Sequence, residues 1–385
     1  MNNTICSGAW TDININFFDR FVRHCCRANE EFFPHELNST FFNQSQGVVD
    51  RRIDLINGKQ HHQCSKCWKD YETTGTAYRD IKNEWTTIND VSDKIKTIEI
   101  FLDNTCDMSC VYCCPNDSSK IAREQGISFK NSIIQNDIDE FFIWLKTIQL
   151  DNIGINFLGG EVTASKNFYN FVERLKMSIS ADIHIGILTN CNTNQNNMNK
   201  IINCFDNLPS NWDINLSISN ESVQPSKLIR WGLNWDKFSK NFETYLNHPK
   251  INYICLSPSP SIFSIKYMYE YFEWVFEIVK KTNKKCMVFG NWVQNPGVLD
   301  PARCKKDYKI YIDRLENLFL SNEDIFKSGP DTDKTGSVTF AIKWLKKLKN
   351  RIGTVEPKLD ELDEWFNEMY MFKKDKQIYN LKQYL

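Results

Sequence analysis

The stretch IKTIEIFLDNTCDMSCVYC, residues 95–113, contains the pattern that decides the fold. Its first ten residues form an apolar, β-branched run that ends in small and polar residues, which is typical of a buried strand. Three cysteines, Cys106, Cys110 and Cys113, follow this run directly. The segment therefore predicts a strand whose carboxyl end carries a loop with three thiols.

Five further runs of this kind follow, at residues 153–160, 183–190, 212–220, 251–259 and 286–293. Between the runs lie amphipathic stretches with apolar residues at helical spacing, at residues 138–147, 168–177, 198–205, 235–247 and 266–281. This alternation predicts a parallel sheet with right-handed crossovers. Because six strands are fewer than a closed TIM barrel needs, we expect an α/β fold with a partial (β/α)6 barrel.

The two flanks of this pattern differ from it. Residues 1–94 are rich in cysteine, aromatic residues and turn formers, with little periodicity. Residues 301–385 have helical spacing at 308–320, 341–350 and 359–372. The sequence thus predicts an N-terminal cysteine-rich, cluster-binding region over residues 1–94, the partial barrel over 95–300 and a helical C-terminal extension over 301–385.

Composition narrows the class of protein. The 385 residues are 41% hydrophobic with a formal net charge of −1, which gives no electrostatic case for binding nucleic acid or an anionic membrane. Neither a secretory signal nor an apolar run of membrane-spanning length is present, so we expect a cytoplasmic location. In a reducing compartment the 14 cysteines favour ligation over disulfides, and nine of them precede residue 115.

The three-cysteine loop has one functional interpretation and two simpler ones. Three thiolates can hold three irons of a [4Fe–4S] cluster and leave the fourth iron open. An open iron can chelate a small molecule through an amine and a carboxylate. Alternatively, the thiolates could bind zinc with a distant fourth ligand, or the cysteines could be inert and buried.

Polar or flexible residues end the next strands. Gly159, Gly160 and Glu161 follow the second strand. They could form an ordinary flexible loop, or the glycines could let the backbone approach a ligand while Glu161 meets an ammonium group.

The third and fourth strands end in further candidates. Asn190 ends the third strand, and Ser217 and Ser219 share one face of the fourth strand. Arg230 comes eleven residues after Ser219, near the start of a helix. It could offer a bidentate guanidinium to a carboxylate or form a surface ion pair.

The segment CDMSCVYC, residues 106–113, resembles the CxxxCxΦC signature of the radical S-adenosylmethionine superfamily, with Tyr112 as the aromatic residue. The resemblance extends over residues 95–300. It implies that the open iron binds the amino and carboxylate groups of S-adenosylmethionine. Reduction of the cluster then cleaves this cofactor to methionine and a 5′-deoxyadenosyl radical. The adjacent Cys114 is not an expected ligand.

The same resemblance implies roles for the other strand ends. The Gly159-Gly160-Glu161 motif would hold the amino group of the cofactor, and Arg230, within IRWGLNWDKFSKN, would pair with its carboxylate. The remaining candidate cofactor contacts are Tyr112, Asn190, Ser217 and Ser219. Val293, at the end of the sixth strand, could contact adenine or pack in the core.

A second set of cysteines lies in the N-terminal region. It comprises Cys6 in CSGAW, the pair Cys25-Cys26, and Cys64 and Cys67 in CSKCW. Four thiolates could bind zinc or a fully ligated iron–sulfur cluster. The preceding His61 and His62 could replace a cysteine as zinc ligands.

These N-terminal motifs together resemble the auxiliary-cluster half of twitch or SPASM domains, which usually follow the barrel. The resemblance implies an auxiliary [4Fe–4S] cluster held by Cys6, Cys25, Cys64 and Cys67, with Cys26 as the rival of Cys25. Gly75 and Arg79, in TGTAYRD, resemble a motif that follows CxxC in such proteins. A second cluster would relay electrons, accept one from a substrate radical, or shape the pocket.

The favoured function is an enzyme that abstracts a hydrogen atom from a substrate, with a peptide or protein preferred over a nucleotide or small metabolite. Methyl transfer and sulfur insertion are other outcomes of radical chemistry. The alternative class is a zinc-stabilised, non-catalytic binding or scaffold protein. A flavodoxin or ferredoxin is implied as electron donor by the resemblance. Cys191, past the third strand, could donate a hydrogen atom or simply pack.

Overall fold

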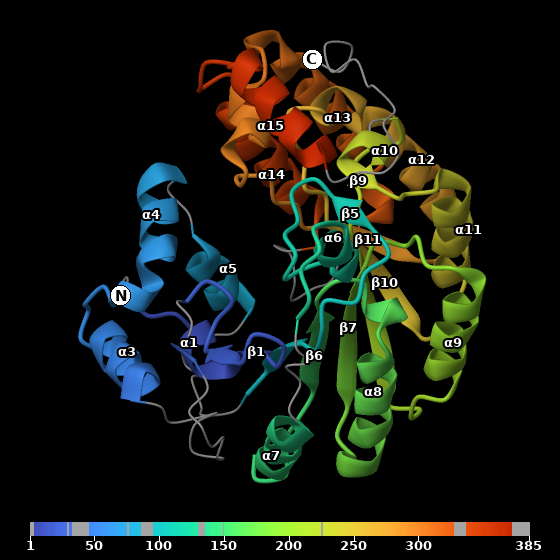
Figure 1. Cartoon of the computed structure of the whole chain (residues 1–385). Coiled ribbons are helices and arrows are strands. Elements are labelled where there is room, and N and C mark those ends of the chain that lie inside the picture. The colour runs from blue at the N-terminus through green and yellow to red at the C-terminus, as the bar shows by residue number, and fades with distance from the viewer. Residues whose placement is uncertain are drawn as a thin grey trace.

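The structure is a computed structural model of the chain, and it describes residues 4–28, 31–32, 46–74, 77–85, 95–129, 135–148, 150–224, 226–326 and 336–371. Within these residues the centre of the fold is a nine-stranded, mostly parallel sheet with the order β11-β10-β8-β7-β6-β4-β1-β2-β3. Figure 1 shows helices on both sides of this sheet. The chain therefore has an α/β fold.

The predicted strands are adjacent in this sheet. They are β4 (Thr97–Phe101), β6 (Ile153–Leu158), β7 (Ile183–Thr189), β8 (Trp212–Ile218), β10 (Ile251–Leu256) and β11 (Lys285–Val288). Each pairs in parallel with its neighbour, which confirms the predicted parallel sheet. The connecting helices are α7 (Gln135–Leu145), α8 (Lys166–Ser178), α9 (Gln195–Asp206), α11 (Trp235–Leu246) and α12 (Met268–Lys280).

A seventh parallel strand comes from the N-terminal region. Strand β1 (Asp12–Asn16) pairs in parallel with β4, with Asp12 opposite Thr97. Strands β2 (Phe21–Arg23) and β3 (Glu31–Phe32) then continue the sheet antiparallel. The sequence did not indicate β1 because every second residue of DININ is polar, yet all five residues are buried. The N-terminal region, predicted to end at residue 94, therefore contributes strands to the central sheet.

One face of the sheet is apolar and the other carries polar groups. Ile98 and Ile100 of β4 are completely buried and lie in register with Ile155 and Phe157 of β6. The Phe157 ring contacts Phe168 and Phe171 of α8, so α8 covers this face, and burial of each isoleucine contributes roughly 1.5–3 kcal/mol. On the other face a row crosses the sheet in register: Asn14, Glu99, Asn156, Gly186, Asn215 and Tyr253. This polar row lies on the side of the N-terminal helices.

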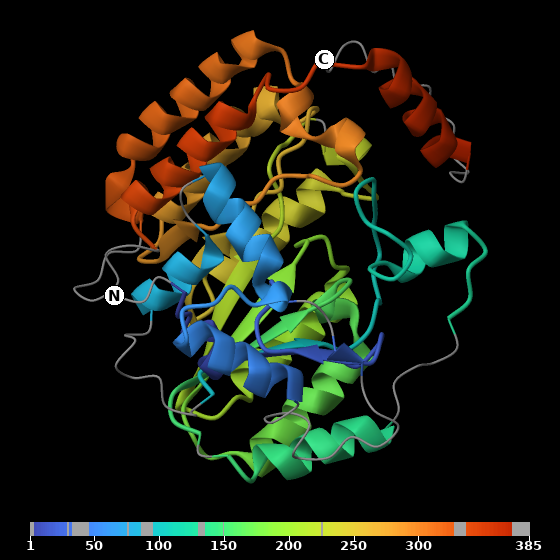
Figure 2. The same cartoon turned by 90° about the vertical axis from the view of Figure 1, so that its left-hand side faces the viewer.

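Helices from both ends of the chain complete the fold. The N-terminal helices are α1 (Gly8–Thr11), α3 (Gln46–Ile56), α4 (Ser65–Thr74) and α5 (Tyr78–Trp85), in front of the sheet in Figure 2. The ammonium group of Lys82, on α5, lies 2.6 Å from the Asp12 carboxylate of β1 and ties these helices to the sheet.

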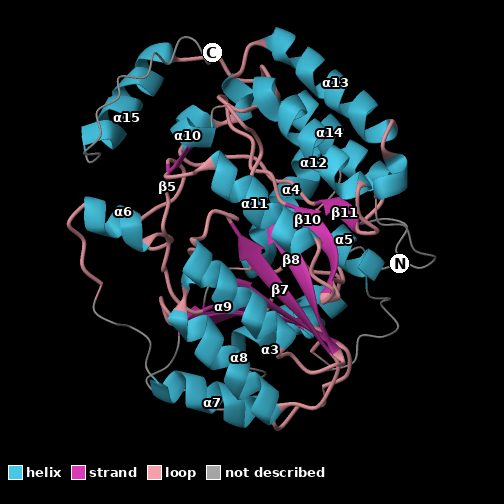
Figure 3. Cartoon of the chain, turned by 90° about the vertical axis from the view of Figure 1, so that its right-hand side faces the viewer, coloured by secondary structure: helices cyan, strands magenta, loops and turns pink. Residues whose placement is uncertain are grey.

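The C-terminal helices are α13 (Lys309–Leu320), α14 (Val338–Arg351) and α15 (Leu359–Met371), close to the predicted ranges. Helix α13 packs on α12, and α14 packs on α13 and β11 (Figure 3). In the described part of the chain, no helix combines the length and the apolar character that crossing a membrane requires.

Candidate functional site

The three-cysteine loop lies between β4 and α6 (Ser119–Glu124) and is closed back onto that helix. The Cys106 amide donates a 3.1 Å hydrogen bond to the Ser119 hydroxyl. The Ser118 hydroxyl caps α6 by accepting from the Ile121 amide, and it donates to the Met108 carbonyl at 2.7 Å. The serines that begin α6 therefore fix the cysteine loop at the carboxyl ends of the strands.

Cys110 lies in a short strand, β5 (Ser109–Cys110), that pairs antiparallel with β9 (Arg230–Trp231). In this pairing the backbone of Cys110 lies opposite that of Arg230. Interaction with the Cys113 thiol lowers the pKa of Cys110, whereas burial raises the pKa of Cys106 to about 12. A Cys106 thiolate thus needs nearby positive charge, which a metal would supply.

Glu161 follows β6 and is tied to the cysteine loop through its backbone. Its amide donates a 2.6 Å hydrogen bond to the carbonyl of Thr105, the residue before Cys106. Its carboxylate Oε1 accepts from the hydroxyls of Thr163 and Thr189, and Oε2 accepts from the Asn190 amide. The side chain is completely buried, and this burial raises the pKa of Glu161 to about 7.

The two glycines before Glu161 allow a close backbone approach. A Cβ on Gly160 would lie 2.3 Å from the Thr105 carbonyl oxygen. Gly159 has φ +139°, and a Cβ there would lie 2.8 Å from the Asp103 carbonyl oxygen. The sequence suggested that these glycines leave room for a ligand, but in the structure they make room for the backbone of the cysteine loop.

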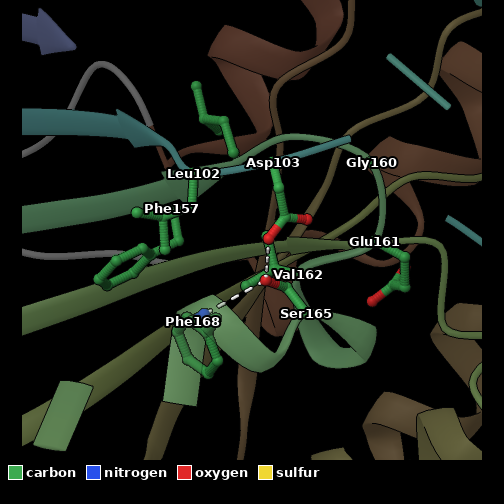
Figure 4. Close-up of a pocket in the computed structure, with 9 residues that line it drawn as sticks. Leu102, Asp103, Phe157, Gly160, Glu161, Val162, Ser165 and Phe168 are labelled. Carbon is green, nitrogen blue, oxygen red and sulfur yellow. Dashed lines mark hydrogen bonds between the residues drawn. The ribbon is translucent and has the colours of Figure 1, made fainter. Parts of the chain in front are cut away.

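Below this contact a small cavity is lined by the ends of β4 and β6 and the start of α8 (Figure 4). The Asp103 carboxylate accepts hydrogen bonds from the Ser165 hydroxyl at 2.5 Å and the Asn167 amide at 2.8 Å. The Ser165 hydroxyl in turn caps α8 by accepting from the Phe168 amide. These bonds hold β4 and α8 in one geometry beneath the loop.

Arg230 is paired with a carboxylate that sequence reasoning missed. Its Nη2 donates to Glu221 Oε2 at 2.8 Å and to the Ser219 hydroxyl at 3.0 Å. Both charged side chains are buried, with exposures of 3% for Arg230 and 0% for Glu221. Glu221 comes two residues after Ser219, and that spacing from the strand end was the signal available for finding it.

Several polar atoms around this pair lack partners. Arg230 Nε, Glu221 Oε1 and the Tyr112 hydroxyl are buried and have no hydrogen-bond partner among the described residues. The Arg230 guanidinium carbon lies 5.5 Å from the centre of the Tyr112 ring. Because buried polar groups are normally satisfied, these atoms fit a polar ligand next to the cysteine loop.

Asn190 binds the cysteine loop itself. Its side-chain amide donates to Asp107 Oδ1 at 3.1 Å, and the amide of Asn192 donates to Asp107 Oδ2 at 3.4 Å. Asp107 was not singled out in the sequence. Ser217 lies in β8 and Ser219 comes directly after the last residue of that strand, so the two-residue period places both on one side of the chain.

Two of the weaker candidates are packing residues. The Cys191 side chain is completely buried, and its thiol donates to the Phe238 carbonyl at 3.6 Å. Val293 is buried within the main hydrophobic core. These placements favour the packing interpretations of both residues.

Four of the five N-terminal cysteines line a second cavity. It is lined by Cys6, Cys25, Cys64 and Cys67, the four residues that we expected to act together. They come from the segment before α1, the turn after β2, and the start of α4. Burial raises the pKa of Cys64 to about 11, so here too a thiolate needs positive charge nearby.

The structure also separates Cys25 from its rival. Cys25 lines the cavity, and its sulfur accepts a 3.4 Å hydrogen bond from the Arg27 amide. Its φ is +133°, a conformation that favours glycine and that strains any other residue. Cys26 does not line the cavity; its thiol interacts with that of Cys25 and with Glu99 and Tyr78. The strained backbone thus turns Cys25 toward the other thiols.

The two predicted histidine alternatives lie elsewhere. The His61 and His62 rings contact each other with centroids 4.3 Å apart and planes tilted by 39°, and neither residue lines the cavity. Gly75 lies outside the described residues. Among the residues that the structure describes, no three His, Cys, Asp or Glu side chains are close enough to hold a single metal ion.

Comparisons with known proteins add little to this geometry. No family model matches the chain, and no curated protein matches it. One solved structure that aligns with it is that of TYW1 with a lysine-pyruvate adduct bound. It is 12% identical over 60% of this chain and 74% of that chain, with a TM-score of 0.32. At such similarity, the functional argument comes from the site itself.

Proposed function

We propose that this chain is a radical S-adenosylmethionine enzyme with a partial (β/α)6 barrel. The observation that carries the proposal is that Glu161 and Arg230 both contact the three-cysteine loop. The carbonyl of Thr105, next to Cys106, accepts a hydrogen bond from the Glu161 amide, and the backbone of Cys110 pairs with that of Arg230 in the β5–β9 sheet. The candidate ligands of the cluster and of the cofactor's two polar groups are therefore held together at the carboxyl ends of the parallel strands.

Cys106, Cys110 and Cys113 would hold a [4Fe–4S] cluster with one open iron, as their place in a single loop allows. With S-adenosylmethionine bound, such a cluster supplies a 5′-deoxyadenosyl radical upon reduction. The chain's own residues would bind and orient this cofactor.

Glu161 Oε2 accepts only the Asn190 amide among the described residues, so it keeps lone-pair capacity for an ammonium group. Arg230 Nε lacks a described partner and would donate to a carboxylate, while Nη2 remains on Glu221. The Glu221 pair would fix the guanidinium plane. Ser217, Ser219 and Tyr112 would complete the surroundings of the cofactor.

The polar row on the sheet face indicates the kind of substrate. Within this row the Asn14 side chain donates to Glu99 and accepts from Arg23, whereas Asn156 and Asn215 add further side-chain amides. Asn215 Oδ1 is buried without a described partner. Such a surface suits a substrate rich in hydrogen-bonding groups, and we infer a peptide or protein. The hydrogen atom would come from that substrate.

The four cysteines of the second cavity would hold an auxiliary [4Fe–4S] cluster in a twitch- or SPASM-like region. All four cysteines line this one cavity, as a fully ligated cluster requires. A flavodoxin or ferredoxin would provide the electrons.

The decisive experiment is anaerobic reconstitution with iron and sulfide, followed by incubation with S-adenosylmethionine and a reductant. The wild-type chain should produce 5′-deoxyadenosine. The Cys106→Ala variant should produce at least about a hundredfold less, whereas Cys114→Ala, which changes an exposed neighbouring thiol, should match the wild type. Equal product from Cys106→Ala and wild type would refute the proposal.

A further inference from the structure

The wall of the N-terminal cavity contains two buried arginines as well as the four cysteines. Arg51, on α3, is 1% exposed, and Arg79, on α5, is 3% exposed. Both line the cavity together with Cys6, Cys25, Cys64 and Cys67. Arginine is rarely this deeply buried without a counter-ion.

Arg79 is held in a fixed position but lacks partners for its outer nitrogens. Its guanidinium carbon lies 4.2 Å from the centre of the Trp68 ring and 5.0 Å from that of Tyr71. Its Nε lies 3.4 Å from Asp80 Oδ1. Both Nη1 and Nη2 are buried with no hydrogen-bond partner among the described residues. The aromatic rings and Asp80 therefore orient the guanidinium, and its Nη1 and Nη2 donors have no partner among the described residues.

Arg51 also has a buried donor nitrogen without a described partner. Its Nη2 donates to the His24 carbonyl at 2.5 Å, next to Cys25 in the chain. Its Nε is buried and has no described partner. A neutral carbonyl does not compensate the buried Arg51 cation. Arg79 pairs with Asp80 through Nε, but its two outer nitrogens have no described partner, so the free donors of both arginines fit an anion in the cavity.

An iron–sulfur cluster with four thiolate ligands would supply the negative charge that compensates the two arginines. Four thiolates around an oxidised [4Fe–4S] core give a net charge of about −2, and reduction adds one more negative charge. Its sulfur atoms accept hydrogen bonds from N–H groups.

Resting on the proposed auxiliary cluster, we propose that Arg51 and Arg79 are positioning residues for that cluster. They compensate its charge and donate hydrogen bonds to its sulfur atoms. Because positive charge stabilises the more negative reduced form, the two arginines raise the reduction potential of the cluster. This cluster is thereby biased toward accepting an electron.

The test uses the full chain with Cys106, Cys110 and Cys113 replaced by alanine, so that only the auxiliary cluster remains. After anaerobic reconstitution, iron and sulfide are quantified and the cluster is titrated with reductant while its EPR signal is recorded. Arg51→Gln, Arg79→Gln and Arg79→Lys are compared in this background. The control, Arg52→Gln, removes a partly exposed arginine of the same helix that does not line the cavity.

At a fixed solution potential, Arg79→Gln and Arg51→Gln should each lower the ratio of reduced to oxidised cluster by about tenfold, the usual weight of one charge-assisted hydrogen bond. Arg79→Lys should stay within about threefold of the background, because it keeps the charge. The ratio in Arg52→Gln should also stay within about threefold of the background.

Unchanged titrations in both glutamine variants, with full iron content, would overturn the inference and leave the auxiliary cluster standing. Equal loss of iron from Arg79→Gln and Arg79→Lys would also overturn it, since it would assign Arg79 to packing against Trp68 and Tyr71. If the background protein itself binds zinc or no iron, the proposed auxiliary cluster is refuted, and the inference about the arginines is refuted with it.

Discussion

Cys110 and Arg230 lie opposite each other across the two-stranded β5–β9 sheet, although 120 positions separate them in the chain. The pairing joins the cysteine loop to the segment that follows β8. Arg230 is anchored in turn by the buried carboxylate of Glu221. The position of Cys110, a candidate cluster ligand, therefore depends on the ion pair between Arg230 and Glu221, two residues far from Cys110 in the sequence.

Replacing Arg230 with methionine should destabilise the chain strongly. The variant leaves Glu221 buried without its cation, which costs roughly 3–5 kcal/mol of the free energy of unfolding. Urea unfolding of the metal-free protein measures this loss. The double variant Arg230→Met/Glu221→Met should recover most of it, because no charge remains buried. A double variant as unstable as the single one would contradict this explanation.

Replacing Gly160 with alanine should disturb the cysteine loop. The new Cβ would lie 2.3 Å from the Thr105 carbonyl oxygen, and relief of this overlap should cost about 1–3 kcal/mol. Reconstituted protein should also contain less iron, because the displaced backbone is next to Cys106. Gly297→Ala is the matched control, since no atom lies within 4 Å of its added Cβ. If both variants keep full stability and iron, the contact is not essential.

The stability of the metal-free chain should decrease as pH rises from about 4.3 to 7. Burial raises the pKa of Glu161 to about 7, so over this range the folded state binds more protons than the unfolded state. The stabilisation is complete below the unfolded pKa and is lost as pH rises through the folded one. The full effect is about 3 kcal/mol.

Urea unfolding at several pH values tests this sign. The Glu161→Gln variant should lose the slope that Glu161 contributes, whatever its absolute stability. An identical pH dependence in wild type and Glu161→Gln would show that the carboxyl group does not titrate in this range.

Cys25 and Cys26 should differ in iron binding. With Cys106, Cys110 and Cys113 replaced by alanine, the chain should hold about four irons, and Cys25→Ser should reduce this to below about one. Cys26→Ser should retain the iron, because Cys26 does not line the cavity. Iron quantification after anaerobic reconstitution measures both. The reverse result would mean that Cys26 is the ligand.

The parallel sheet and its helices were predictable because their signals are local. Each predicted strand is a short apolar run such as IEIF, and each helix has apolar residues at helical spacing. Strand β1 escaped prediction because its buried Asp12, Asn14 and Asn16 are polar. Asp12 is tolerated there because Lys82, on α5, pairs with it, and this partner is distant in sequence.

The candidate site was predictable to a similar degree. Cysteine spacing singled out both sets of candidate ligands, and four N-terminal cysteines line one cavity in the structure. Glu161 and Arg230 were found from their positions after strand ends. Their partners Thr189 and Glu221 were missed. The bond between Thr189 and Glu161 joins residues 28 positions apart, and the local signal for Glu221 was its place two residues after Ser219.

By itself, the sequence determined the order of strands and helices and the thiol chemistry of the chain, because periodicity and short spacings act over a few residues. Only the tertiary structure decided how these parts meet. It turned Cys25 rather than Cys26 into the cavity through a backbone at φ +133°, and it buried Arg230 against Glu221. Both outcomes depend on packing between distant segments, where the strain and the desolvation are offset only once the whole fold has formed.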